Sequence, residues 1–141
     1  MSTQSKKVYI AKDGFLSFID REHPQHVHVS AFFRYFAQEH FLLYTTFLTI
    51  NEVYEELYKN INPSLAKDFL RIMYLSSVNI IYPESTDIKS AIKTVATSSS
   101  SGLTFSKALM SVVCNRQSIP QICTFEALHP LFGLQVFYLP V

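Results

Sequence analysis

Glycine is scarce in this sequence, and no excess of charge of one sign is present. The 141 residues include 3 glycines and 6 prolines, while 48% are hydrophobic and 16% are charged. Disordered chains are poor in apolar residues, so this composition predicts a chain that is ordered nearly throughout. The formal net charge of +1 lacks the basic excess of proteins that hold nucleic acid by neutralising many phosphates. Tight non-specific nucleic-acid binding is therefore excluded.

Long apolar runs are also missing. No window reaches the apolar length of a membrane span, and residues 1–7 are polar with no apolar stretch of signal-peptide type behind them. We therefore expect a cytoplasmic protein without a membrane partner.

Cys114 and Cys123 lie within apolar elements, and cysteines in such a setting are more often buried thiols than a disulfide.

Apolar periodicity alternates between strand and helix patterns along the chain. Strands are expected at 8–10, 42–44, 79–82 and 121–124, with a possible fifth at 135–139. Helices are expected at 14–19, 25–40, 49–59, 62–73, 83–95 and 105–113. The serine run at 98–102 predicts a mobile loop.

Two helix starts carry capping signals. Thr49 and Glu52 have the spacing of a capping box, in which the hydroxyl and the carboxylate satisfy each other's backbone donors. Asn62 followed by Pro63 has the form of an N-cap with proline at the first helical position. Both signals predict where a helix begins.

Strands separated by helices, with no tight hairpin signal, indicate crossover connections and a parallel sheet covered on both faces. The predicted fold class is α/β, a three-layer α/β/α sandwich with a central parallel sheet of four to five strands, in one domain spanning 1–141. Sites in such folds gather at the carboxyl ends of the strands. Here those ends are 11–13, the segment leading to Glu52, and 124–126.

Short runs at these strand ends follow a recognisable pattern. Ala11, Lys12 and Asp13 follow the first apolar strand, Glu52 opens the helix after the second strand, and Thr-Phe-Glu126 ends the fourth. In this order the sequence resembles the PIN-domain family, which includes the VapC-like toxin ribonucleases of bacterial toxin–antitoxin pairs. The resemblance implies a PIN-like α/β/α sandwich, divalent-metal RNA cleavage, an antitoxin-like partner and a homodimer.

The chain departs from the family pattern at two acids. Ala11 stands where the family has Asp, and Lys107, which precedes Ala-Leu on a late helix, stands where the family has its third acid. Glu52 is retained, and Glu126 replaces an Asp. Asp13, Glu52 and Glu126 are therefore the remnant catalytic acids that the resemblance implies.

Active PIN domains hold Mg²⁺ or Mn²⁺ with about four carboxylates, which are hard oxygen ligands. A lysine ammonium about 4 Å from such a cation would be repelled by about 8 kcal/mol at an effective dielectric near 20, an upper-end value. We expect no cofactor, or Mg²⁺ or Mn²⁺ held by Asp13, Glu52 and Glu126 if the remnant site still binds metal. The sharper hypothesis is that the Lys107 ammonium takes the place of the metal among these carboxylates.

Plainer interpretations stand beside these. Glu52 would serve as a helix cap, and Lys107 as a solvated helix lysine. Lys12 and Asp13 would be turn residues after the first strand, and Glu126 would favour the start of a following short helix. The histidines at 23, 26 and 28 do not have metal-ligand spacing.

Three functions remain open. The first is an RNA- or protein-binding module that no longer cleaves RNA and meets phosphate with Lys12 and Lys107. The second is a weak Mg²⁺- or Mn²⁺-dependent endoribonuclease that uses Asp13, Glu52 and Glu126. The third is a homodimer whose aromatic helix faces bind another protein, such as an antitoxin.

Overall fold

Strand β1 runs through the middle of a five-stranded parallel sheet in the computed structural model of the chain, which describes residues 5–99, 102–129 and 132–140. The strand order is β3-β2-β1-β4-β5, and every pairing is parallel. The strands are β1 (Lys7–Ile10), β2 (Leu42–Thr46), β3 (Asn79–Ile81), β4 (Gln121–Cys123) and β5 (Gln135–Val136). The predicted parallel sheet, with its possible fifth strand, is confirmed.

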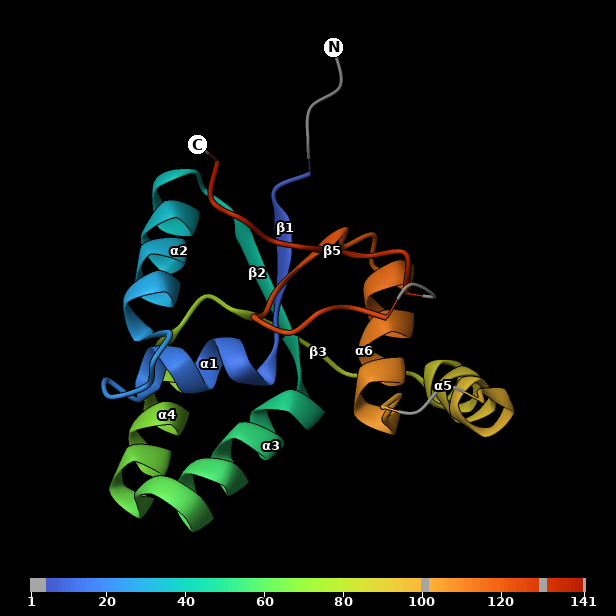
Figure 1. The fold of residues 1–141 in the computed structure, drawn as a ribbon, viewed down its shortest axis with the longest axis horizontal. Coiled ribbons are helices and arrows are strands. Elements are labelled where there is room, and N and C mark those ends of the chain that lie inside the picture. The colour runs from blue at the N-terminus through green and yellow to red at the C-terminus, as the bar shows by residue number, and fades with distance from the viewer. Residues whose placement is uncertain (1–4, 100–101, 130–131, 141) are drawn as a thin grey trace.

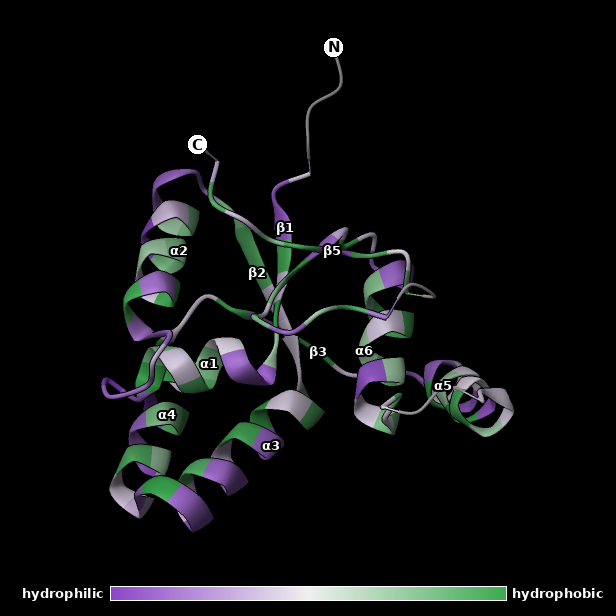
Figure 2. Cartoon of the chain, in the orientation of Figure 1, coloured by the Kyte–Doolittle hydropathy of each residue, from purple (hydrophilic) through white to green (hydrophobic). Residues whose placement is uncertain are grey.

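Helices cover both faces of this sheet, as Figure 1 shows. They are α1 (Lys12–Ile19), α2 (His26–Gln38), α3 (Phe47–Glu56), the π-helix η1 (Leu57–Ile61), α4 (Pro63–Leu75), α5 (Ser85–Thr97) and α6 (Phe105–Arg116). One hydrophobic core gathers side chains of α1 to α4, and a second gathers side chains of α5 and α6. In Figure 2 the helices carry hydrophobic and hydrophilic bands, as expected of elements with one face on a sheet.

The central strand contributes to both cores. Val8 and Ile10 belong to the core under α1 to α4, whereas Tyr9, between them, belongs to the core under α5 and α6. All three are fully buried. Successive side chains of a strand point to opposite faces, so an unbroken apolar run is what a central strand of a covered sheet requires.

The two predicted helix starts have different outcomes. Asn62 caps α4 as expected, because its Oδ1 accepts hydrogen bonds from the backbone N–H groups of Ser64 and Leu65. The prediction of a capping box at Thr49 is wrong. Thr46 is the N-cap of α3, and its Oγ1 accepts the hydrogen bond from the Thr49 N–H, so the N-cap lies three residues earlier than the sequence suggested.

Other boundaries also differ from the expectations. Helix α1 begins at Lys12, so Lys12 and Asp13 form its first turn and are not turn residues between strand and helix. The expected helix at 49–59 changes into η1 after Glu56. Of the expected mobile loop at 98–102, residues 100 and 101 lie outside the described part of the chain.

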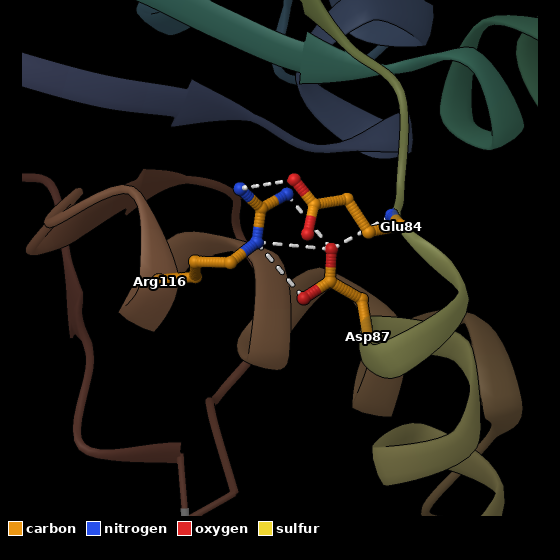
Figure 3. A network of polar contacts seen from close by, with 3 residues as sticks. All are labelled: Glu84, Asp87 and Arg116. Atoms are coloured by element: carbon orange, nitrogen blue, oxygen red, sulfur yellow. Dashed lines mark hydrogen bonds and ion pairs between the residues drawn. The ribbon is translucent and has the colours of Figure 1, made fainter.

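An ion-pair network joins the start of α5 to the end of α6 (Figure 3). The guanidinium of Arg116 donates to both carboxylate oxygens of Asp87 at 2.8–3.0 Å, and its Nη1 lies 3.6 Å from Oε1 of Glu84. Asp87 also accepts the backbone N–H of Glu84, which closes a capping box at the start of α5. Because Asp87 is buried, this network fixes how α5 lies on α6.

Both cysteines are free and buried, as predicted. Within the described residues, no helix is long and apolar enough to cross a membrane.

Candidate functional site

A pocket of about 700 Å³ opens where the central strands end and helices α1, α3 and α6 begin. All the residues that the sequence singled out line it: Ala11, Lys12, Asp13, Glu52, Lys107 and Glu126. The residues at the strand ends therefore lie together around one pocket, because the carboxyl ends of parallel strands meet at one edge of a sheet.

Helix α1 reaches the pocket through an unusually close approach to β4. A Cβ on Gly14 would lie 2.9 Å from the carbonyl oxygen of Cys123, so only glycine fits there. The backbone N–H of Ala11 donates to the same carbonyl oxygen at 3.2 Å. The first turn of α1 is therefore held tightly against the end of β4.

This approach lets Asp13 bind the chain beyond β4. Its Oδ2 accepts hydrogen bonds from Oγ1 of Thr124 at 2.8 Å and from the backbone N–H of Phe125 at 2.7 Å. A carboxylate that accepts a backbone N–H and a hydroxyl makes charge-assisted bonds, which are stronger than neutral ones. Asp13 thus links the first turn of α1 to the segment after β4.

Glu52 enters the pocket from the second turn of α3. The start of this helix is fixed by a buried hydroxyl cluster, in which the phenol of Tyr9 is hydrogen-bonded to Thr46 at 2.9 Å and to Thr49 at 2.7 Å. Burial raises the pKa of Tyr9, so the phenol stays neutral. Because Thr46 is the cap, Glu52 is not a capping residue, and its Oε2 instead accepts the hydroxyl of Ser106 at 3.2 Å.

Lys107 lies in the first turn of α6, where Oγ1 of Thr104 caps the helix by accepting the Lys107 N–H. Its Nζ is 3.2 Å from Oε2 of Glu126, and the two side chains are 45% and 61% exposed. Of the three carboxylates expected around this ammonium, Glu126 forms an ion pair with it, while Asp13 and Glu52 have the neutral partners described above. A cation near a helix N-terminus opposes the macrodipole, and the Glu126 carboxylate offsets this.

Three pocket residues were missed from the sequence. Glu56 lies one turn beyond Glu52 on the same face of α3, and the i, i+4 spacing could have revealed it. Ser106 precedes Lys107 on α6, and its hydrogen bond to Glu52 was not predicted. His129 lines the pocket from the segment after β4, and nothing in the sequence pattern marked it.

Acidic side chains outnumber basic ones in the pocket. Its lining holds four carboxylates, Asp13, Glu52, Glu56 and Glu126, and two ammonium groups, Lys12 and Lys107. Three helices, α1, α3 and α6, begin at this pocket, and a helix N-terminus has the effect of roughly half a positive charge. The two ammonium groups and the helix N-termini therefore offset much of the negative charge of the four carboxylates.

The remaining side chains do not fit the metal that the family resemblance implies. Ala11 offers no ligand, Oδ2 of Asp13 accepts two hydrogen bonds, and Glu126 holds an ammonium. In the described part of the chain, no group of three or more His, Cys, Asp or Glu side chains is placed to hold a metal ion. This includes the histidines at 23, 26 and 28, each of which has a hydrogen-bond partner in the chain.

A second, apolar pocket of about 460 Å³ lies between α1, α2 and α4. Its lining includes Phe18, Phe33, Ile72 and Leu75. Leu75 is 81% exposed and the neighbouring Tyr74 is 89% exposed, which is unusual for large apolar side chains. Exposed apolar surface of this kind is typical of an interaction site.

The chain was compared with known proteins in three ways. Comparisons with protein-family models and with curated proteins found no match. Among solved structures, it is similar to the VapC20 toxin of Mycobacterium tuberculosis, which cleaves the sarcin-ricin loop, with a TM-score of 0.75 and 13% sequence identity. The match covers 84% of this chain and 89% of that one.

Proposed function

Because the chain has a VapC-like PIN-domain fold, we propose that it is an RNA-binding protein that has lost metal-dependent RNA cleavage. The observation that carries this proposal is the ion pair between Lys107 and Glu126, which lies in the pocket at the end of the sheet. The resemblance implies an acid of the metal site at position 107, where this chain carries the Lys107 ammonium.

The argument against metal-dependent cleavage is electrostatic. Relative to the family pattern, Ala11 removes one negative charge, and Lys107 removes another and adds a positive one. A divalent ion would have to displace the ammonium from Glu126 and compete with the Thr124 hydroxyl and the Phe125 N–H for Asp13. Both exchanges weaken metal binding, since like charges repel and Oδ2 of Asp13 already accepts two hydrogen bonds, neither of which involves its Oδ1.

The argument for RNA rests on the same pocket. Lys12 is exposed and Lys107 is half-exposed, so both ammonium groups can reach a phosphate. The N-termini of α1, α3 and α6 add backbone N–H donors at the same edge. With so few cations, binding is weak and falls steeply as salt is added. A cytoplasmic location, where RNA is available, is part of this proposal.

The test restores the two acids. Wild-type protein and the double variant Ala11→Asp/Lys107→Asp are incubated with single-stranded and structured RNA, with and without Mn²⁺. We expect Mn²⁺-dependent cleavage by the double variant alone, and Ala11→Asn/Lys107→Asn is the matched control, since it adds side chains of similar size without carboxylates.

The alternative is the weak Mg²⁺- or Mn²⁺-dependent ribonuclease that uses Asp13, Glu52 and Glu126. It predicts that wild-type protein cleaves RNA when Mn²⁺ is added, and that a chelator or Glu52→Ala abolishes this Mn²⁺-dependent cleavage. Those results together would overturn the proposal.

A second candidate function is protein binding, by an antitoxin-like partner or by a second copy in a homodimer. The exposed apolar residues around the second pocket, Leu75 above all, favour it. Sedimentation of the purified chain, alone and with Leu75→Lys, tests the homodimer. A dimer that dissociates in the variant supports this role, whereas a monomer at high concentration leaves only a different protein as the partner.

A further inference from the structure

We propose that the pocket also cleaves RNA slowly without any metal, by transferring the phosphate to the neighbouring 2′-hydroxyl. This inference rests on the proposed function, because it takes RNA as the ligand and the Lys107 ammonium as the resident cation. It assigns a reaction to Lys107 and His129, which the metal-based chemistry does not use, acting together with Glu52.

The pocket gathers the three kinds of group that this reaction needs. Glu52, Lys107 and His129 line the same cavity from α3, from α6 and from the segment after β4. A carboxylate can accept a proton, an ammonium can stabilise developing charge on phosphate oxygens, and an imidazole can donate a proton near neutral pH. No ion or cofactor is required for any of these roles.

The step balances without a further reactant. The 2′-hydroxyl loses its proton to the Glu52 carboxylate while its oxygen forms a bond to phosphorus. The bond from phosphorus to the 5′-oxygen breaks, and the His129 imidazolium gives that oxygen a proton. The products are a 2′,3′-cyclic phosphate and a 5′-hydroxyl. No atom is oxidised or reduced.

The partners of the two glutamates decide which one acts as the base. Glu126 holds the Lys107 ammonium at 3.2 Å, whereas Glu52 accepts only the neutral hydroxyl of Ser106, also at 3.2 Å. A proton can therefore reach Glu52 without breaking an ion pair. Lys107 is 45% exposed, and exposed ion pairs contribute little stability, so its ammonium can turn from Glu126 to an incoming phosphate at small cost.

The chemistry also restricts the substrate. DNA lacks the attacking hydroxyl, so it can bind in the pocket but cannot be cut. A DNA strand with one ribonucleotide is cut only after that nucleotide.

The experiment measures cleavage in the presence of excess EDTA. Wild-type protein is incubated with a labelled single-stranded RNA and with DNA strands that carry a single ribonucleotide of each base. We expect cleavage with 2′,3′-cyclic phosphate ends, and none of the all-DNA strand. His129→Gln, Glu52→Gln and Lys107→Gln should each lower the rate by about 100-fold or more.

Matched controls lie outside the pocket. Glu55→Gln is on the same helix as Glu52. His28→Gln is at an exposed position of α2, and Lys93→Gln is at an exposed position of α5. These variants should cleave at the wild-type rate, and their contrast with the three pocket variants, purified in the same way, excludes a contaminating ribonuclease. Replacing the 5′-oxygen of the nucleotide that follows the single ribonucleotide by sulfur gives a leaving group that needs no proton, so it should rescue His129→Gln and not Glu52→Gln.

The outcomes of the two proposals are separable. If wild-type protein in EDTA cleaves no faster than His129→Gln, or leaves 3′-hydroxyl ends, the metal-free reaction is overturned while the proposed RNA binding stands. If RNA does not bind at low salt, the proposed function fails, and this inference fails with it. If cleavage appears only with Mn²⁺, both the loss of metal dependence and the metal-free reaction are wrong.

Discussion

Lys107 and Glu126 form an ion pair that joins the first turn of α6 to the segment after β4, with Nζ 3.2 Å from Oε2. Both side chains are about half-exposed, so water and salt screen their attraction. The pair therefore contributes more to the charge of the pocket than to the stability of the fold.

A double-mutant cycle measures this contribution. We expect Lys107→Ala, Glu126→Ala and the double variant to give a coupling free energy of about 0.2–1 kcal/mol in urea unfolding. Higher salt should reduce it further. A coupling of several kcal/mol would mean that the pair is a structural link and would weaken its interpretation as a substitute cation.

Asp13 should affect stability even though it lines the pocket. Asp13→Ala leaves the Thr124 hydroxyl and the Phe125 N–H without their acceptor, and we expect it to lower the free energy of unfolding by about 1–3 kcal/mol. Asp13→Asn keeps an oxygen acceptor and should cost less. Glu22→Ala, in an exposed turn, is the comparison in thermal unfolding, and equal effects of the two alanine variants would rule out the structural role.

Asp87 should give the protein an acid-sensitive stability. Hydrogen bonds from Arg116, aided by the Glu84 N–H, hold the pKa of Asp87 below its ordinary value of 3.8, although burial opposes this. The unfolded chain then binds the proton more readily, so this stability is present above the ordinary pKa and is lost as the pH falls through the folded-state value. Stability measured against pH in urea should show this loss.

Removing the Asp87 charge tests the same network (Figure 3). Asp87→Asn should lower the free energy of unfolding at neutral pH by about 1–3 kcal/mol and flatten the acid limb of the stability curve. Asp68→Asn breaks an exposed ion pair with Arg71 on α4 and is the control, with an expected loss under about 1 kcal/mol. Identical acid limbs in wild-type protein and Asp87→Asn would exclude Asp87 as the cause.

The cysteines should be inert while the chain is folded. Burial raises the pKa of both Cys114 and Cys123 to about 12, with the negative charge of Asp13 adding to the rise at Cys123. Since only the thiolate reacts, neither should be labelled by a thiol reagent at pH 8 until urea unfolds the protein. These raised values favour the folded state below the ordinary thiol pKa, and that contribution is lost as the pH rises toward 12.

The sequence predicted those parts of the fold that depend on local pattern. The strands, the order of elements and the Asn62 cap follow from residues close together in the chain. The start of α3 does not. Thr46 and Thr49 are both capable caps, and the choice involves the buried phenol of Tyr9, which is hydrogen-bonded to both hydroxyls from a strand nearly 40 residues earlier.

The pocket could be located from the strand ends, but its internal bonds could not. Asp13 and Phe125 are 112 residues apart in the chain, and their bond depends on Gly14 allowing α1 to approach β4. The sequence left three carboxylates as possible partners of the Lys107 ammonium. Only the folded structure shows that Glu126 forms the ion pair. His129 follows the last predicted motif on an irregular segment, where periodicity carries no information.

Strand β2 passes into α3 at Thr46 with no loop between them. A helix turns by about 100° for each residue, so inserting a single amino acid at this junction would carry Glu52 and Glu56 together to another side of α3. The number of carboxylates in the cavity thus depends on the length of the chain at the junction of β2 and α3 as well as on which amino acids are present. An insertion at this junction in a related sequence would remove these carboxylates from the cavity without a substitution at either residue.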